Sequence, residues 1–274
     1  MPRVRRRIFL GLPWVGLALA ACGGGSTTVT HRQQGTHQVR YGDDPSQYAE
    51  LTLPEGTPRG VVVVIHGGFW RAQYGIDYAR PLVPSLVDAG WAAWAIEYRR
   101  VGPAGSGGGG GTPETFDDVA RAIDTLRHQD LDLSTVIALG HSAGGHLATW
   151  AAGREAPEVP VTAVVSQAGV LDLVAAAQEH LGSDAVLALL GHEPGPADAR
   201  WDPRQQVPLG VPVRCVHATG DDIVPIDQSE TYVQAAQEAG ADATLTKVEG
   251  DHFVVIDPES PAWQTQLRIL ESLA

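Results

Sequence analysis

Residues 135–148, TVIALGHSAGGHLA, combine a short apolar run with small residues on both sides of a serine. Val136–Leu139 is a short apolar run that predicts a buried strand, and the residues from about Ala143 to Ala152 predict a helix. Small residues on both sides of Ser142 let the backbone turn sharply from the strand into the helix. The G-x-S-x-G pattern at such a turn presents a serine hydroxyl at the carboxyl end of the strand, so Ser142 is the candidate nucleophile. The alternative is that Ser142 only caps the helix.

Strand and helix patterns alternate along the chain from about residue 38 onward. Val61–Ile65 is a continuous apolar run, typical of a parallel strand that is buried on both faces. The alternation predicts one α/β domain, with a mostly parallel central sheet and helices on both faces of the sheet. The other predicted strands are 47–53, 91–97, 161–166, 213–217 and 243–248, and the other predicted helices are 78–89, 115–128, 228–239 and a last one from about residue 263.

Two long segments interrupt this alternation. Residues 101–113 contain a run of consecutive glycines, which predicts a mobile surface loop because glycine has little conformational preference. Residues 171–212 lie between two predicted strands and are too long for a simple connection. We expect this second segment to form a small cap over the edge of the sheet.

The composition indicates a protein with a large core and argues against a nucleic-acid partner. Hydrophobic residues make up 43% of the 274 residues, which is enough for one large core and excludes a disordered chain. Four of the 19 Lys and Arg residues lie before residue 22, which leaves 15 of them against 32 Asp and Glu residues in the rest of the chain. Phosphate binding needs clustered cations, and this distribution does not supply them.

The amino terminus has the pattern of a bacterial export signal. A basic start with a pair of arginines that resembles a twin-arginine motif precedes the apolar run Ile8–Leu19, and the run ends in Leu19-Ala20-Ala21-Cys22, which resembles a lipobox. We predict a signal peptide over 1–21, lipidation of Cys22, a flexible tether over 22–37 and a folded domain over 38–274. The lipid would anchor the exported protein to the outer face of a bacterial membrane, in the cell envelope. An uncleaved anchor or an accidental apolar start is the alternative.

His66-Gly67-Gly68-Phe69-Trp70 follows the predicted strand Val61–Ile65 directly. Glycines at this place let the chain turn and expose backbone N–H groups, as an oxyanion hole requires. We expect His66 to shape the loop, and the alternative is that the glycine pair forms only a tight turn. The predicted donors are the amides of Gly68, Phe69 and Ala143.

An acid and a base follow further along the chain. Asp221 comes directly after the predicted strand 213–217, and His252 comes directly after the predicted strand 243–248. Parallel strands deliver their carboxyl ends to one edge of the sheet, so Ser142, Asp221 and His252 are expected to meet there. Asp222 and Asp172 are the alternatives for the acid. The remaining histidines of this region are interpreted as surface, packing or structural residues: His141, His146, His180, His192 and His217.

The motifs together resemble the α/β-hydrolases, in the esterase and lipase group. The segments VIHGGFWR (64–71) and GHSAGGHLA (140–148) are similar to those of the kynurenine formamidase-like branch, and the resemblance covers the chain from about residue 45. It implies Ser142 as nucleophile, His252 as base, Asp221 as acid, and the HGG-x-W loop as oxyanion hole. The chain differs from the carboxylesterase HGGG form at Phe69, which keeps a backbone donor but adds a bulky wall.

These observations predict a serine hydrolase that cleaves carboxylic esters of modest size. The predicted pocket walls are Trp70, Tyr74 and Trp201, together with Phe69. No C-x-x-C or H-E-x-x-H pattern occurs, so neither a metal nor another cofactor is expected. The partners are a small-molecule ester and, through Cys22, a membrane, while the oligomeric state stays open. An arylformamidase is the alternative enzyme, and a non-catalytic lipoprotein that uses the fold as a binding module is the alternative of another class.

Overall fold

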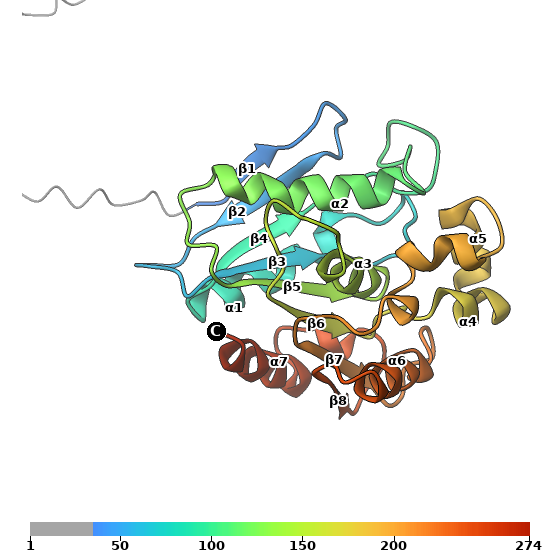
Figure 1. Cartoon of the computed structure of the whole chain (residues 1–274). Helices are drawn as coiled ribbons and strands as arrows, with labels where there is room; N and C mark the ends of the chain where they lie inside the picture. Colours follow the sequence, from blue (N-terminus) through green and yellow to red (C-terminus); the bar gives the residue numbers. More distant parts are fainter. Residues whose placement is uncertain (1–34) are drawn as a thin grey trace, which may run out of the picture. The chain divides into compact units, whose positions relative to one another are not determined.

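A single sheet of eight strands runs through the part of the chain that the computed structural model describes, residues 35–274 (Figure 1). The strands are β1 (His37–Arg40), β2 (Tyr48–Thr52), β3 (Val61–Ile65), β4 (Ala92–Ile96), β5 (Val136–His141), β6 (Ala163–Gln167), β7 (Val213–Ala218) and β8 (Ala243–Val248). Their order across the sheet is β1-β2-β4-β3-β5-β6-β7-β8. β2 is antiparallel to both of its neighbours, and all other neighbouring strands are parallel. The predicted α/β fold with a mostly parallel sheet is confirmed.

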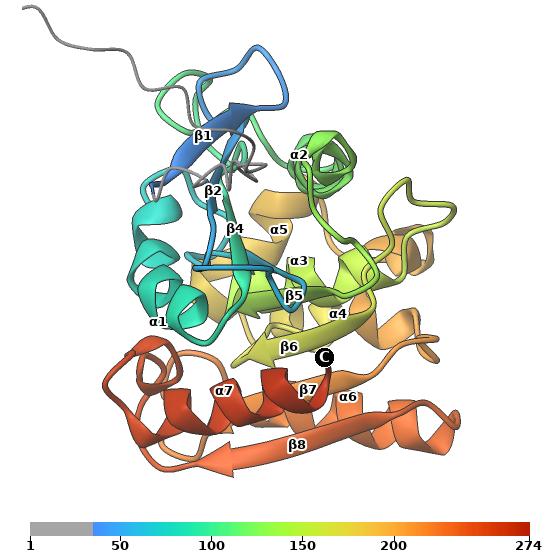
Figure 2. The same ribbon diagram turned by 90° about the vertical axis from the view of Figure 1, so that its left-hand side faces the viewer.

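Helices cover both faces of this sheet (Figure 2). They are α1 (Val83–Asp88), α2 (Glu114–Asp124), α3 (Ala143–Ala152), α4 (Leu173–Gln178), α5 (Leu181–Leu190), α6 (Asp227–Glu238) and α7 (Pro261–Ser272). Alternate residues of β3 point to opposite faces, since Val61, Val63 and Ile65 join the core beneath α2, α3 and α6, whereas Val62 and Val64 join the core beneath α1 and α7. The all-apolar sequence of β3 is therefore explained by burial on both sides.

The segment predicted as one helix over residues 78–89 is shorter than expected. Two 3-10 turns, Ile76–Tyr78 and Arg80–Leu82, precede α1, which begins at Val83. Pro81 and Pro84 explain the difference, because proline lacks the amide that a helix interior needs and is tolerated only in the first turn. The edge strand β1 was not predicted, since most of its residues are exposed and it has no apolar pattern.

Residues 1–34, which hold the predicted signal peptide and Cys22, lie outside the described residues, so their export and lipidation stay predictions. β1 begins at His37, the residue at which the predicted tether ends. Within residues 35–274, no helix combines the length and the apolar character needed to cross a membrane.

The insertion between β6 and β7 contributes α4, α5 and two 3-10 turns, Pro196–Trp201 and Pro203–Gln205. α4 and α5 lie beyond the end of the sheet at which the parallel strands finish (Figure 1). The guanidinium of Arg71, on the loop after β3, donates to the backbone carbonyls of Gly182 and Ser183 at the start of α5. This contact joins the insertion to the site edge of the sheet, as expected of a small cap.

The glycine-rich loop folds back on the strand that precedes it. The Arg100 amide donates to the Gly107 carbonyl, and the Gly110 amide donates to the Arg100 carbonyl, both at 2.8 Å. The Thr112 amide donates to the Leu189 carbonyl at 2.9 Å, which fastens the loop to α5. The loop therefore has a defined backbone path, and its mobility stays a prediction.

The close approach of α3 to β3 should make Gly144 indispensable for folding. A Cβ at this position would lie 2.1 Å from the carbonyl oxygen of Ile65, and backbone cannot yield as a flexible side chain can. Gly144→Ala gains about 1 kcal/mol of helix propensity, but the overlap should lower the free energy of unfolding by more than about 2 kcal/mol. Urea denaturation measures the difference. Gly210→Ala is the matched control, since a Cβ there meets no atom within 4 Å, and equal stability of the two variants would contradict the packing argument.

Candidate active site

Ser142 occupies the turn between β5 and α3. Its backbone has φ +55° and ψ −120°, a strained conformation for a residue with a side chain, of the kind that clusters at functional sites. The surrounding backbone fixes this turn, because the Ser142 amide donates to the Gln167 carbonyl at 2.8 Å and the Ser142 carbonyl accepts the His146 amide at 3.1 Å. The strand-to-helix turn predicted from the sequence is confirmed.

The loops after β7 and β8 bring Asp221 and His252 together. Nδ1 of His252 lies 2.6 Å from Oδ2 of Asp221, and neither side chain is more than 4% exposed. The other carboxylate oxygen, Oδ1, accepts the amides of Ile223 at 2.9 Å and Val224 at 2.8 Å. Burial raises the pKa of Asp221, but hydrogen bonds from His217, His252 and the Val224 amide outweigh burial and hold this pKa well below its usual value. Asp221 is therefore ionised at neutral pH, and it accepts a hydrogen bond from the N–H at Nδ1 of His252.

The two alternatives for the acid lie elsewhere. Asp222 is exposed, and the side chain of Asp172 accepts the amide of Ala175 at 2.8 Å as the cap of α4. Of these three carboxylates, Asp221 is the one that the structure places on His252.

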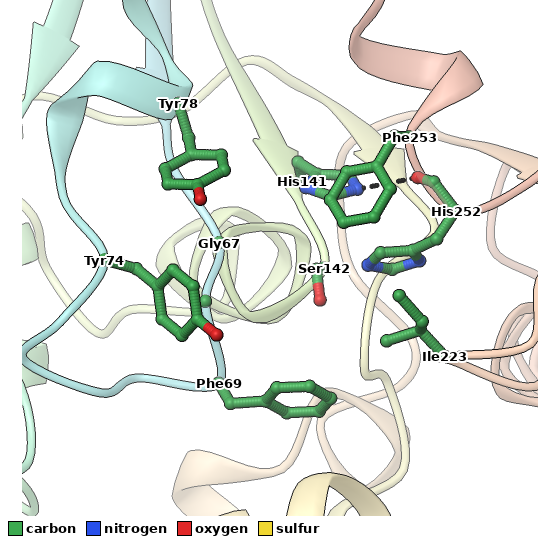
Figure 3. A pocket seen from close by; sticks show the side chains of 10 residues that line it. Gly67, Phe69, Tyr74, Tyr78, His141, Ser142, Ile223, His252 and Phe253 are labelled. Atoms are coloured by element: carbon green, nitrogen blue, oxygen red, sulfur yellow. Dashed lines mark hydrogen bonds between the residues drawn. The ribbon is translucent and has the colours of Figure 1, made fainter.

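Ser142 and His252 face each other across one pocket (Figure 3). The hydroxyl of Ser142 and a ring nitrogen of His252 point into the same space. No hydrogen bond between these two side chains occurs in residues 35–274, and such bonds are often long before a substrate is bound. His141 supports the base, because its Nε2 donates to the backbone carbonyl of His252 at 3.0 Å. Burial lowers the pKa of His141 to about 3, so its imidazole is neutral at the pH where His252 works.

The loop after β3 forms another wall of the pocket through Gly67, Gly68 and Phe69. Gly68 has φ +106°, and a Cβ there would lie 2.3 Å from Cβ of Tyr74, so only glycine fits. The amides of Gly68 and Phe69 donate to no other described residue. Ala143 is the first residue of α3, where backbone amides have no helical acceptor. The three predicted oxyanion donors therefore sit on segments that flank Ser142, and their role stays a prediction.

Comparisons with known proteins identify a family and a fold for this chain. The family model BD-FAE matches residues 50–235, more than half of the chain. The chain belongs to the BD-FAE family. A curated relative is the kynurenine formamidase of Salmo salar, 26% identical over 255 residues, which cover 83% of this chain and 79% of the relative.

Solved structures with this fold include two esterases. A truncated carbohydrate esterase from gut microbiota superposes with a TM-score of 0.72 at 22% identity, over 86% of this chain and 94% of that one. Esterase 2 of Thermogutta terrifontis, phosphonylated by sarin, gives a TM-score of 0.71 at 22% identity, over 88% of this chain and 94% of that one. At this identity the two structures show the fold. This BD-FAE member thus has the α/β-hydrolase fold, as the resemblance implied.

Two of the predicted pocket walls of this BD-FAE member were wrong. Trp70 is fully buried and packs edge-on against His146, with 5.1 Å between ring centroids, and Trp201 packs on Phe116 at 4.4 Å. Both indoles bury most of their large apolar surface in the core beneath α2 and α3, with Trp70 fully buried and Trp201 8% exposed. Tyr74, by contrast, lines the pocket as predicted.

Three wall residues were missed by the sequence analysis. Tyr78, Ile223 and Phe253 line the pocket, whose cavity volume is about 110 Å³. Tyr78 and Phe253 are the exposed large hydrophobic residues of the described chain, at 43% and 47% exposure. The position of Phe253 directly after His252 was the available signal, since a neighbour of the base must lie near the site.

A buried charged cluster supports the oxyanion loop of this protein from behind. His66 Nδ1 lies 2.8 Å from the Gly67 carbonyl and its Nε2 lies 3.0 Å from Oε1 of Glu97, which also pairs with Arg100. Burial and the neighbouring Arg100 lower the pKa of His66 to about 3, so the ring is neutral and its single N–H donates to one of these two acceptors at a time. These bonds fit the expected role of His66 in shaping the loop. No group of three or more His, Cys, Asp or Glu side chains suited to hold a metal occurs in residues 35–274.

Proposed function

We propose that this protein is a serine hydrolase that cleaves carboxylic esters through a covalent acyl-enzyme. The observation that carries the proposal is the buried Asp221–His252 hydrogen bond beside a strained serine whose hydroxyl faces the same imidazole. A third group that orients the base, and a base next to the nucleophile, are the parts that activate a serine at neutral pH. The predicted lipid at Cys22 would place this activity at the cell envelope.

The proposed reaction begins with attack of Ser142 Oγ on the ester carbonyl carbon while His252 takes the hydroxyl proton. Asp221 holds the imidazole in the tautomer that accepts this proton, and it stabilises the imidazolium that forms. The negative charge on the former carbonyl oxygen falls on the amides of Gly68, Phe69 and Ala143, and each such donor lowers the barrier by about 2.7–4 kcal/mol. His252 then gives the proton to the departing alcohol oxygen. Water, deprotonated by His252, releases the acid and restores Ser142.

The pocket favours small uncharged esters. Its walls are glycines, aromatic rings and Ile223, with Ser142, His141 and His252 as the polar contributions, and no Lys, Arg, Asp or Glu side chain lines it. Apolar walls with a few directed polar groups are the usual lining of a small-molecule site. A charged substrate group would be desolvated there without a partner, which is unfavourable.

Replacing the nucleophile should abolish turnover without disturbing the fold. Ser142→Ala should lower kcat for p-nitrophenyl acetate by at least about 10³-fold, since the activated oxygen is lost. A fluorophosphonate probe should add one adduct to the wild type and none to Ser142→Ala, as read by intact mass. Ser272→Ala, at an exposed position, is the control and should keep both properties.

Near-normal turnover in Ser142→Ala would refute the nucleophile. A wild type that neither turns over esters nor takes up the probe would instead favour the non-catalytic binding lipoprotein.

An arylformamidase is the second candidate, supported by the similarity to the Salmo salar kynurenine formamidase over 83% of the chain. The same attack by Ser142 would then cleave a formamide bond, and the leaving group would be an amine instead of an alcohol. N-formylkynurenine carries an ammonium and a carboxylate, for which the pocket lining has no oppositely charged partner. We therefore expect kcat/KM to be higher for short p-nitrophenyl esters than for N-formylkynurenine. A preference of more than about tenfold for the formamide, or about 1.4 kcal/mol in barrier, would overturn the choice of esters.

A further inference from the structure

We propose that His217 is a positioning residue, a second imidazole donor that fixes the Asp221 carboxylate and takes up part of its negative charge before that carboxylate serves His252. The proposal rests on the proposed function. His217 is predicted from the sequence to be a surface or packing residue, but the structure places it in direct contact with the acid.

His217 and His252 share one oxygen of the carboxylate. His217 lies on β7, four residues before Asp221, and its Nε2 is 3.2 Å from Oδ2, the oxygen that Nδ1 of His252 contacts at 2.6 Å. The side chains of His217 and Asp221 are both 0% exposed. Water therefore does not compete for this contact, and the electrostatic interaction between the two side chains is not screened by solvent.

The neighbours of His217 determine which ring nitrogen carries the proton. Nε2 faces two acceptors, the Asp221 carboxylate and the Val224 carbonyl at 2.9 Å, so this nitrogen must bear hydrogen. Nδ1 lies 2.8 Å from the hydroxyl of Ser229, which can donate to it. A neutral imidazole that donates from Nε2 and accepts at Nδ1 fits these contacts, with its one Nε2–H shared between the Val224 carbonyl and the Asp221 carboxylate. Ser229 therefore locks the tautomer that points a proton at Asp221.

Four N–H groups surround the carboxylate. Oδ1 accepts the amides of Ile223 and Val224, and Oδ2 accepts Nδ1 of His252. Nε2 of His217, which is hydrogen-bonded to the Val224 carbonyl, also lies 3.2 Å from Oδ2. A buried carboxylate with this many donors is fixed in rotation, so its Oδ2 stays aimed at Nδ1 of His252. The contact with His217 reduces the negative charge that Asp221 presents to His252, which moderates the basicity of the His252 imidazole.

The two buried titratable groups that contact this cluster, His141 and Cys215, stay neutral at the pH of interest. His141, on β5, contacts the ring and the carbonyl of His252, and burial lowers its pKa to about 3. Cys215, on β7, bonds Ser229, and burial raises its thiol pKa to about 12. The exposed carboxylates of Asp222 and Asp251 flank Asp221 and His252 in the chain. They are common to every variant compared below, so a difference between variants reports on His217.

The test compares two substitutions of His217 with a matched control. His217→Leu removes the donor, whereas His217→Gln keeps an N–H at the place of Nε2. His146→Leu is the control, because His146 is also a fully buried histidine whose Nε2 bonds a backbone carbonyl, that of Trp201 at 2.8 Å, and it does not touch Asp221. Folded fractions are measured by circular dichroism and used to normalise all rates.

We expect His217→Leu to lower kcat for p-nitrophenyl acetate by about tenfold, the effect usual for a lost supporting hydrogen bond, with KM changed by less than about threefold. The acid limb of the kcat/KM profile should move to higher pH by about half a unit, because the unshared charge of Asp221 favours the imidazolium of His252. His217→Gln should restore the wild-type limb, and His146→Leu should leave it in place.

A wild-type acid limb in His217→Leu, or the same displacement in His146→Leu, would overturn the proposal. If His217→Leu does not fold, His217→Gln is compared with Ser229→Ala instead. His217→Gln should have the wild-type acid limb of the kcat/KM profile. Ser229→Ala should move that limb to higher pH, because Ser229 no longer fixes the tautomer of His217. NMR titration of the His252 ring in Ser142→Ala needs no turnover. An unchanged His252 titration on removal of the His217 donor refutes the present inference, whereas failure of fluorophosphonate labelling in the wild type refutes the proposed function.

Discussion

One buried negative charge organises the candidate site, the carboxylate of Asp221 at the carboxyl edge of the sheet. A charge removed from water is unfavourable unless hydrogen bonds replace its hydration, and here two backbone amides and two imidazoles do so. Those donors come from β7, the turn after it and the loop after β8. The parallel order of β7 and β8 is thus what makes the charge tolerable, and the charge in turn fixes the imidazole of His252.

The nucleophile and the base are also joined through the strand between them. Gln167, at the end of β6, accepts the Ser142 amide with its backbone carbonyl and donates from its side chain to the Val255 carbonyl, at 2.8 and 2.7 Å. His141 makes the second link, from the end of β5 to the His252 carbonyl. These contacts at the carboxyl ends of the strands hold the strained turn at Ser142 and the loop after β8 that carries His252. Such rigid support is what a reaction that depends on a fraction of an ångström requires.

The sequence alone predicted the structural elements that depend on a short stretch of residues. The strand β3, the helix α3 and the turn at Ser142 follow from residue pattern and from the need for small neighbours, and the pairing of Asp221 with His252 follows from chain order in a parallel sheet. Side-chain direction was the part that could not be predicted. Trp70 follows the oxyanion loop in sequence, yet its left-handed backbone, φ +54°, turns it into the core. His217 could not be assigned either, because its role depends on a carboxylate that the turn after β7 folds back onto it.

The role of Asp221 is measured by kcat/KM of Asp221→Asn and Asp222→Asn for one ester at pH 7, since the two substitutions make the same chemical change in adjacent residues. Asp221→Asn should lower kcat/KM by on the order of 10⁴-fold, because an amide in place of the carboxylate favours the wrong tautomer of His252. Asp222→Asn, at an exposed side chain, should stay within about threefold of the wild type. A loss in Asp222→Asn that equals or exceeds the loss in Asp221→Asn would contradict the account.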